Sequence, residues 1–144
     1  MSNHAAIIGA TTWGTTLGIL LAQNKVPVVL LARTEDEART LSSQRRNARF
    51  LPDTPFPDRL SVTSQPEAAL QQADLVIIAV PSDRLRENVL RIMPHLRTGA
   101  IILSAAKGLE LPTARRMSQV MEEVLPAGFH SGICVLSGPN LAKE

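Results

Sequence analysis

Residues 5–14 read Ala-Ala-Ile-Ile-Gly-Ala-Thr-Thr-Trp-Gly, and this stretch decides the fold. The four apolar residues predict a buried strand, and the pattern over residues 15–23 predicts a helix. In a Gly-x-Gly-x-x-Gly turn between strand and helix, the first glycine makes the turn, the second admits a pyrophosphate and the third allows close packing. Gly9 and Gly14 occupy the first and third places, and Thr11 occupies the second.

Further apolar runs recur along the chain, at residues 28–32, 75–80, 100–103 and 133–136, with a weaker candidate at 60–63. The runs are continuous rather than alternating, which is typical of parallel strands covered by helices on both faces. Helical spacing lies between them, so strand alternates with helix. The sequence therefore predicts one α/β domain over residues 1–144, a Rossmann-type, doubly wound, mainly parallel sheet with helices on both faces.

Signals for the starts of helices support this order. Thr34 precedes three acidic residues and is a candidate N-cap, and Ser82 follows Pro81 at another expected start. A later helix is expected to open at Pro112 and to end near Leu125. The Pro- and Asp-rich stretch 47–63 is expected to be an excursion with the single weak strand, and a short helix is expected over 66–72.

Composition excludes several classes of function. The 144 residues carry a net charge of +2, with 15 basic and 13 acidic residues interspersed, so no basic stripe for nucleic acid is expected. One cysteine, Cys134, permits no disulfide within the chain, and no metal site is expected. A signal peptide and an apolar run of membrane-spanning length are both missing from the sequence. These features predict a cytoplasmic protein without membrane insertion.

The ends of the predicted strands carry the candidate binding residues, because ligands of such sheets lie outside the carboxyl ends of the strands. The amides of Gly9–Gly14 and the helix that follows suit an anionic pyrophosphate. Arg33 follows the second run, where an acid would favour NAD and an arginine accommodates the 2′-phosphate of NADP. Ion pairing of Arg33 with the cluster Glu35–Glu37 is the alternative interpretation.

Three later strand ends extend this set. Pro81 ends its strand abruptly, either as a plain terminator or as a flat edge for a nicotinamide or ribose. Lys107 stands between small residues, where a cation could balance a phosphate or polarise a carbonyl. The turn 137–140 could hold a small polar ligand or simply close the sheet.

In this order the sequence resembles the bacterial-type NAD(P)-dependent glycerol-3-phosphate dehydrogenases. The matching stretches are residues 9–14, Asn-Ala-Arg-Phe-Leu-Pro at 47–52, Ala-Val-Pro-Ser at 79–82, Ala-Lys-Gly-Leu-Glu at 106–110 and Ser-Gly-Pro-Asn-Leu-Ala-Lys-Glu at 137–144. The resemblance implies an enzyme that interconverts dihydroxyacetone phosphate and sn-glycerol 3-phosphate by hydride transfer, for glycerophospholipid synthesis. It also implies a homodimer in the full-length enzyme.

The resemblance further implies roles for individual residues. Lys107 is shared by cofactor and substrate in this interpretation, and Gly138 and Asn140 contact the substrate. The cofactor, NADP or NAD, is then bound by Gly9, Thr11, Thr12, Trp13, Gly14, Arg33, Phe50, Pro81, Lys107 and Ala142.

This chain departs from the family pattern at two positions. The family keeps glycine at the place of Thr11, so a β-carbon there is expected to crowd the pyrophosphate or shift the turn. Asn140 replaces the usual Ser or Thr and can still donate a hydrogen bond. In the family a helical domain with the proton-donating lysine follows, and it is absent from this sequence. No residue here is therefore expected to act as the general acid, and the chain alone is expected to be inactive or nearly so.

Two other interpretations remain open. One is a non-catalytic nucleotide-binding or sensor module, which Thr11 and the missing second domain favour. The other is a two-domain dehydrogenase of the hydroxyacid or ketopantoate type, which shares the fold but lacks the Ser-Gly-Pro-x-x-Ala-Lys-Glu segment.

Overall fold

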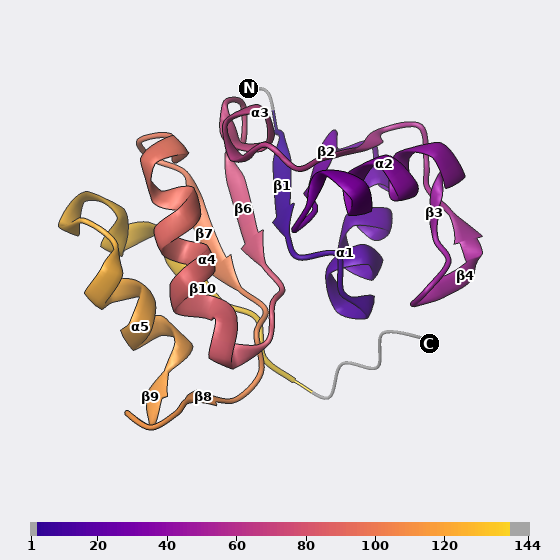
Figure 1. The fold of residues 1–144 in the computed structure, drawn as a ribbon. Helices are drawn as coiled ribbons and strands as arrows, with labels where there is room; N and C mark the ends of the chain where they lie inside the picture. Colours follow the sequence, from indigo (N-terminus) through magenta and orange to yellow (C-terminus); the bar gives the residue numbers. More distant parts are fainter. Residues whose placement is uncertain (1–2, 139–144) are drawn as a thin grey trace.

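A computed structural model describes residues 3–138, with a six-stranded parallel sheet between two layers of helices (Figure 1). The strands are β1 (Ala5–Ile8), β2 (Val28–Leu31), β5 (Leu60–Thr63), β6 (Leu75–Ile78), β7 (Ile101–Ser104) and β10 (Ile133–Val135). Their order across the sheet is β10-β7-β6-β1-β2-β5, and each neighbouring pair is parallel. This is the strand order of the Rossmann fold, so the predicted fold class is confirmed.

The helices are α1 (Thr12–Gln23), α2 (Glu35–Gln44), α3 (Pro66–Leu70), α4 (Leu85–Ile92) and α5 (Met117–Val124), with 3₁₀ turns η1 (Ser82–Arg84), η2 (Met93–His95) and η3 (Ala127–Gly132). Alternate residues of β1 enter opposite cores. Ile7 packs with α1 and α2, whereas Ile8 packs with α3, α4 and α5. Because both faces are covered, every residue of β1 is buried, which explains the continuous apolar run.

The last strand, β10, differs from the others. It lies at the edge of the sheet and pairs only with β7. Cys134 and Val135 are exposed there, although their apolar run resembles those of the buried strands. The sequence pattern cannot distinguish an edge strand from a central one, because both carry the same residue types.

The predicted helix at Pro112 begins only at Met117. Residues 109–116 instead form an antiparallel ribbon of β8 (Leu109–Glu110) and β9 (Arg115–Arg116). Ala114 has a φ of 55° between them, a left-handed conformation that an α-helix cannot contain.

The excursion after α2 is also more ordered than predicted. It contains a second antiparallel ribbon, β3 (Arg46–Asn47) and β4 (Leu51–Pro55), before β5. The first helix, α1, also differs from the prediction, because it starts at Thr12, three residues before the predicted stretch 15–23. Within residues 3–138, the helices lack the length and apolar character needed to cross a bilayer.

Candidate functional site

The centre of the sheet contains a point where the strand order reverses. β1 and β6 are neighbours, and the chain continues from β1 to β2 on one side and from β6 to β7 on the other. The connections leaving the two strands therefore diverge and leave a crevice at their carboxyl ends, where ligands of such sheets bind. The glycine turn 9–14 follows β1 at this crevice, and residues 79–81 follow β6.

Both glycines of the turn are required by close backbone contacts. Gly9 has a φ of 105°, and a β-carbon there would lie 2.8 Å from the carbonyl oxygen of Ala79. A β-carbon at Gly14 would overlap the carbonyl oxygen of Gly9. The first turn of α1 therefore lies directly against the end of β1, as the spacing of the two glycines predicts.

Thr11 fills the place of the missing glycine as the N-cap of α1. Its hydroxyl accepts a hydrogen bond from the Gly14 amide at 3.0 Å and donates one to the Ala79 carbonyl oxygen at 2.8 Å. Its φ of −76° is accessible to any residue, so the backbone at Thr11 needs no glycine. The threonine hydroxyl therefore supports the turn from inside. Whether its β-carbon crowds a pyrophosphate stays a prediction.

Thr12 and Trp13 begin α1, so their amides belong to the positive end of a 12-residue helix. Trp13 is half-buried, and it packs against the core between the sheet and the helices α1 and α2. Its indole Nε1 is buried and has no hydrogen-bond partner among the described residues. This helix terminus has the geometry that binds phosphate groups.

Arg33 lies exposed just beyond the end of β2. Its amide donates to the Glu37 carboxylate at 2.7 Å, and the Ser64 hydroxyl bonds to Glu35. Within residues 3–138 the salt bridges include none between the Arg33 guanidinium and these acids. The alternative interpretation of Arg33 as an ion-pairing residue therefore has no support in this part of the structure.

Phe50 lies in the turn between β3 and β4, with the Arg49 guanidinium 4.9 Å from the centre of its ring. The ribbon reaches the glycine turn through Asn47, whose Nδ2 donates to the Ala10 carbonyl oxygen at 3.1 Å. The sequence pattern alone indicates no separate role for Asn47. The signal that could have found it is its place at the start of the matching stretch 47–52.

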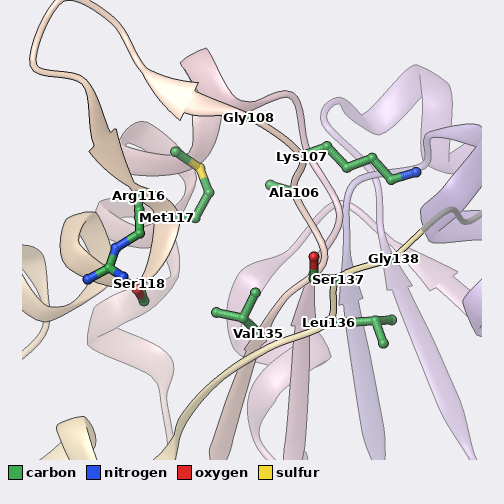
Figure 2. Close-up of a pocket in the computed structure, with 10 residues that line it drawn as sticks. All are labelled: Ala106, Lys107, Gly108, Arg116, Met117, Ser118, Val135, Leu136, Ser137 and Gly138. Carbon is green, nitrogen blue, oxygen red and sulfur yellow. The ribbon is translucent and has the colours of Figure 1, made fainter.

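Pro81 is exposed and precedes η1, three residues beyond the end of β6. Lys107 is exposed on the loop after β7. Lys107 and Gly138 line a common hollow of about 570 Å³, together with Arg116 and Met117 from the other side. Figure 2 shows the Lys107 side chain extending away from Arg116 and Met117.

The hollow brings together only part of the predicted set. The structure places Lys107 and Gly138 in its lining, whereas Gly9, Arg33 and Pro81 follow the ends of β1, β2 and β6 and are not among its lining residues. Because all these strands are parallel, both regions lie at the same end of the sheet. Asn140 and Ala142 lie outside the described residues.

A charged cluster behind the hollow was missed by sequence analysis. Arg86 of α4 forms a two-point ion pair with Glu110 of β8, at 2.7 and 3.0 Å, and the Thr113 hydroxyl also donates to Glu110. Glu123 of α5 accepts from Arg86 at 3.0 Å and pairs with Arg115. Glu110 ends the Lys-Gly-Leu-Glu segment, which is the signal that could have directed attention to it.

Hydrogen bonds from Arg86 and Thr113 lower the pKa of the Glu110 carboxyl from its ordinary 4.5 to about 2. The same pair raises the pKa of Arg86. Both groups are therefore charged at neutral pH, and the ion pair fixes the ribbon that follows Lys107.

Comparison with known proteins agrees with this geometry. Residues 4–144 match the family model for the N-terminus of NAD-dependent glycerol-3-phosphate dehydrogenase. The chain belongs to this family. A glycerol-3-phosphate dehydrogenase [NAD(P)+] from Dehalococcoides mccartyi is 53% identical over 143 residues, which are 99% of this chain and 40% of the relative. One from Chlorobium limicola is 43% identical over 98% of this chain and 42% of that relative.

The solved structure of a glycerol-3-phosphate dehydrogenase from Coxiella burnetii is similar to this chain, with a TM-score of 0.87 and 29% sequence identity. The match covers 98% of this chain and 42% of the Coxiella chain. A ketopantoate reductase from Ralstonia eutropha has a TM-score of 0.67 and 24% identity, over 92% of this chain and 39% of that one. The second likeness shows the shared fold alone. The chain spans about two-fifths of the length of the curated relatives it matches.

Proposed function

We propose that this chain is the NAD(P)-binding part of a glycerol-3-phosphate dehydrogenase that interconverts dihydroxyacetone phosphate and sn-glycerol 3-phosphate by hydride transfer. The observation that carries the proposal is the glycine turn 9–14, fixed against β6 at the reversal of strand order. Membership in the dehydrogenase family supplies the reaction class.

The residues at the crevice fit a dinucleotide. The N-terminus of α1 offers a positive end to the pyrophosphate, and Gly9 lets the turn pack directly against the Ala79 carbonyl oxygen. The exposed Arg33 lies at the second strand end, where it suits a 2′-phosphate, and this supports NADP over NAD. When bound, the nicotinamide supplies the transferred hydride, and we assign Phe50 and Pro81 to the surroundings of the cofactor.

We assign the substrate to the neighbouring hollow. Lys107 lies in the lining of the hollow, and we assign its ammonium group, which extends away from Arg116 and Met117, to the substrate phosphate or to the carbonyl that accepts hydride. Gly138 lies in the same lining without a side chain, which leaves room for a small ligand. Asn140 and Ala142 remain predicted contacts of substrate and cofactor.

The proposal extends to the cellular setting. The balanced charge of 15 basic and 13 acidic residues supports a small-molecule role without a nucleic-acid partner. We place the enzyme in the cytoplasm, without membrane insertion, in a homodimer of the complete protein that serves glycerophospholipid synthesis.

The test joins this chain in frame to the remaining part of the 53% identical relative and follows NADPH oxidation by dihydroxyacetone phosphate. We expect turnover, and we expect Lys107→Met to lower kcat/KM by roughly 100-fold, as for loss of an electrostatic stabiliser. Lys25→Met is the matched control, because Lys25 is an exposed lysine beyond the other end of α1. A folded fusion that binds NADPH without turnover would instead support a non-catalytic nucleotide-binding module.

A further inference from the structure

Asn47 is a buried amide that bonds to the glycine turn from outside the sheet. Its side-chain Nδ2 donates to the Ala10 carbonyl oxygen at 3.1 Å and to the Thr15 hydroxyl oxygen at 2.9 Å. Only 4% of Asn47 is exposed, and Thr15 is fully buried. One amide group, 37 and 32 residues away in sequence, therefore binds both the turn and the first turn of α1.

This contact determines where a carbonyl of the turn is directed. Carbonyl oxygens repel phosphate, so a phosphate-binding turn must direct its amides and not its carbonyls at the ligand. The Ala10 carbonyl oxygen is directed at the buried Asn47 amide, and so it is satisfied within the protein. Loss of the Nδ2 donor would leave this oxygen unsatisfied and free to rotate.

Asn47 also connects the turn to the ribbon that carries Phe50. The Phe50 amide donates to the Asn47 carbonyl oxygen at 3.2 Å, so the two residues share one tight turn. The base of the ribbon is fixed elsewhere, since the Arg45 guanidinium donates to the carbonyl oxygens of Phe56 and Leu60. Asn47 is buried, whereas β4 beyond the turn is largely exposed.

We propose that Asn47 is a positioning residue for the cofactor site. It holds the Ala10 carbonyl inside the protein and fixes the Phe50 ribbon beside the glycine turn, so that cofactor affinity depends on this one amide. The inference rests on the proposed function, because it assigns the cofactor to the same turn. Asn47 itself acts through Ala10, Thr15 and Phe50 rather than by contact with the cofactor.

The experiment measures NADPH dissociation constants by quenching of Trp13, which is the single tryptophan of the chain and stands within the turn. Asn47→Asp keeps the shape and removes both donated bonds. The Thr15 hydroxyl can turn to donate to the new carboxylate, but the buried Ala10 carbonyl oxygen loses its donor and faces a negative charge, so we expect NADPH binding to weaken by roughly tenfold or more. We also expect the fluorescence emission of Trp13 to change in the absence of NADPH, since the turn that contains Trp13 loses its hydrogen bond to residue 47.

Two further variants distinguish positioning from folding. Thr15→Val removes the acceptor without changing the size of the side chain, whereas Thr15→Ser retains it. We expect weaker NADPH binding in the first and the parent affinity in the second. Asn24→Asp is the matched control, because Asn24 donates through Nδ2 to the Leu20 carbonyl oxygen at the far end of α1.

A purely structural role would lower the thermal unfolding midpoint and leave the NADPH affinity of the folded protein unchanged. Parent affinity in folded Asn47→Asp and Thr15→Val would overturn the inference, as would an equal loss in Asn24→Asp. If Asn47→Asp fails to fold, the Thr15 pair decides. No saturable NADPH or NADH binding by the parent chain would overturn the proposed function, and the two failures are thus distinct.

Discussion

Thr11 uses its hydroxyl twice at the start of α1, as acceptor from the Gly14 amide and as donor to the Ala79 carbonyl oxygen. Thr11→Val keeps the shape and removes both bonds. We expect the free energy of unfolding to fall by about 1–2 kcal/mol, the usual effect of losing an N-cap. Denaturant-induced unfolding measures it, with Thr11→Ser as the control that keeps the hydroxyl. Equal stability of the valine and serine variants would contradict this role.

The β-carbon of Thr11 has a separate predicted effect on the cofactor. The sequence predicts that it crowds the pyrophosphate, so Thr11→Gly is expected to bind NADPH more tightly than the parent. The same variant is expected to be slightly less stable, because it loses the cap. Calorimetric titration measures the affinity, and an unchanged dissociation constant would show that the steric argument is wrong.

Arg33 is predicted to select the form of the cofactor. We expect the parent chain to prefer NADPH over NADH, and Arg33→Asp to weaken NADPH binding by roughly tenfold or more, because a charged contact to the 2′-phosphate is lost. Arg39→Asp on α2 is the control, since it makes the same change of charge at an exposed residue. An unchanged ratio of the two dissociation constants in Arg33→Asp would refute the assignment.

The sequence can indicate the role of a single residue only where that role depends on residues close to it in the chain. Gly9, Gly14 and Arg33 stand at fixed positions relative to one strand or turn, so their spacing indicates their place. Asn47 acts on Ala10, 37 residues earlier, and nothing in the spacing shows this contact. The position of Asn47 in the matching segment 47–52 indicates that the segment belongs to the family pattern, but it does not indicate the hydrogen bond to Ala10.

At the level of helices and strands, the ribbon β8–β9 is held by charge. Glu110 bonds to Arg86 of α4, and Glu123 of α5 bonds to both Arg86 and Arg115. The folded pKa of Glu110, about 2, lies below its ordinary 4.5. Its contribution to stability is therefore fully present above about pH 4.5 and is lost as the pH falls toward 2.

We expect Glu110→Gln to be less stable than the parent at neutral pH, and the difference to shrink as the pH falls from 4.5 to 2. Thermal unfolding followed across this range measures it. Glu87→Gln is the control, because Glu87 pairs with Arg84 at the surface, where both side chains are well exposed. A stability difference for Glu110→Gln that does not vary with pH would contradict the account.

The same ribbon shows where prediction of elements fails. The strand runs were found because each is apolar and buried on both faces, and the Thr34 N-cap was found because its bond to the Glu37 amide is local. The start of α5 was misplaced because β8 and β9 pair with each other and are fixed by Arg86, 24 residues before Glu110. Pro112 and Thr113, which precede the helical pattern, do not indicate that contact.

Across the whole molecule, the fold class followed from the alternation of strands and helices, since right-handed crossovers leave few arrangements, whereas the order of the strands comes from the structure. The candidate binding residues at the strand ends fall into two regions. The structure separates the crevice at Gly9 and Arg33 from the hollow at Lys107 and Gly138, on the same end of the sheet.

The central claim is that the ends of β1, β2 and β6 form one nicotinamide-nucleotide site, with the loop after β7 beside it. Amide hydrogen exchange of this chain, with and without saturating NADPH, tests it most directly. We expect slower exchange over residues 9–14, at Arg33 and in the loop 105–108, with no change at the opposite end of the sheet near Lys25. Saturable NADPH binding that leaves residues 9–14 unprotected, or no saturable binding at all, would contradict it.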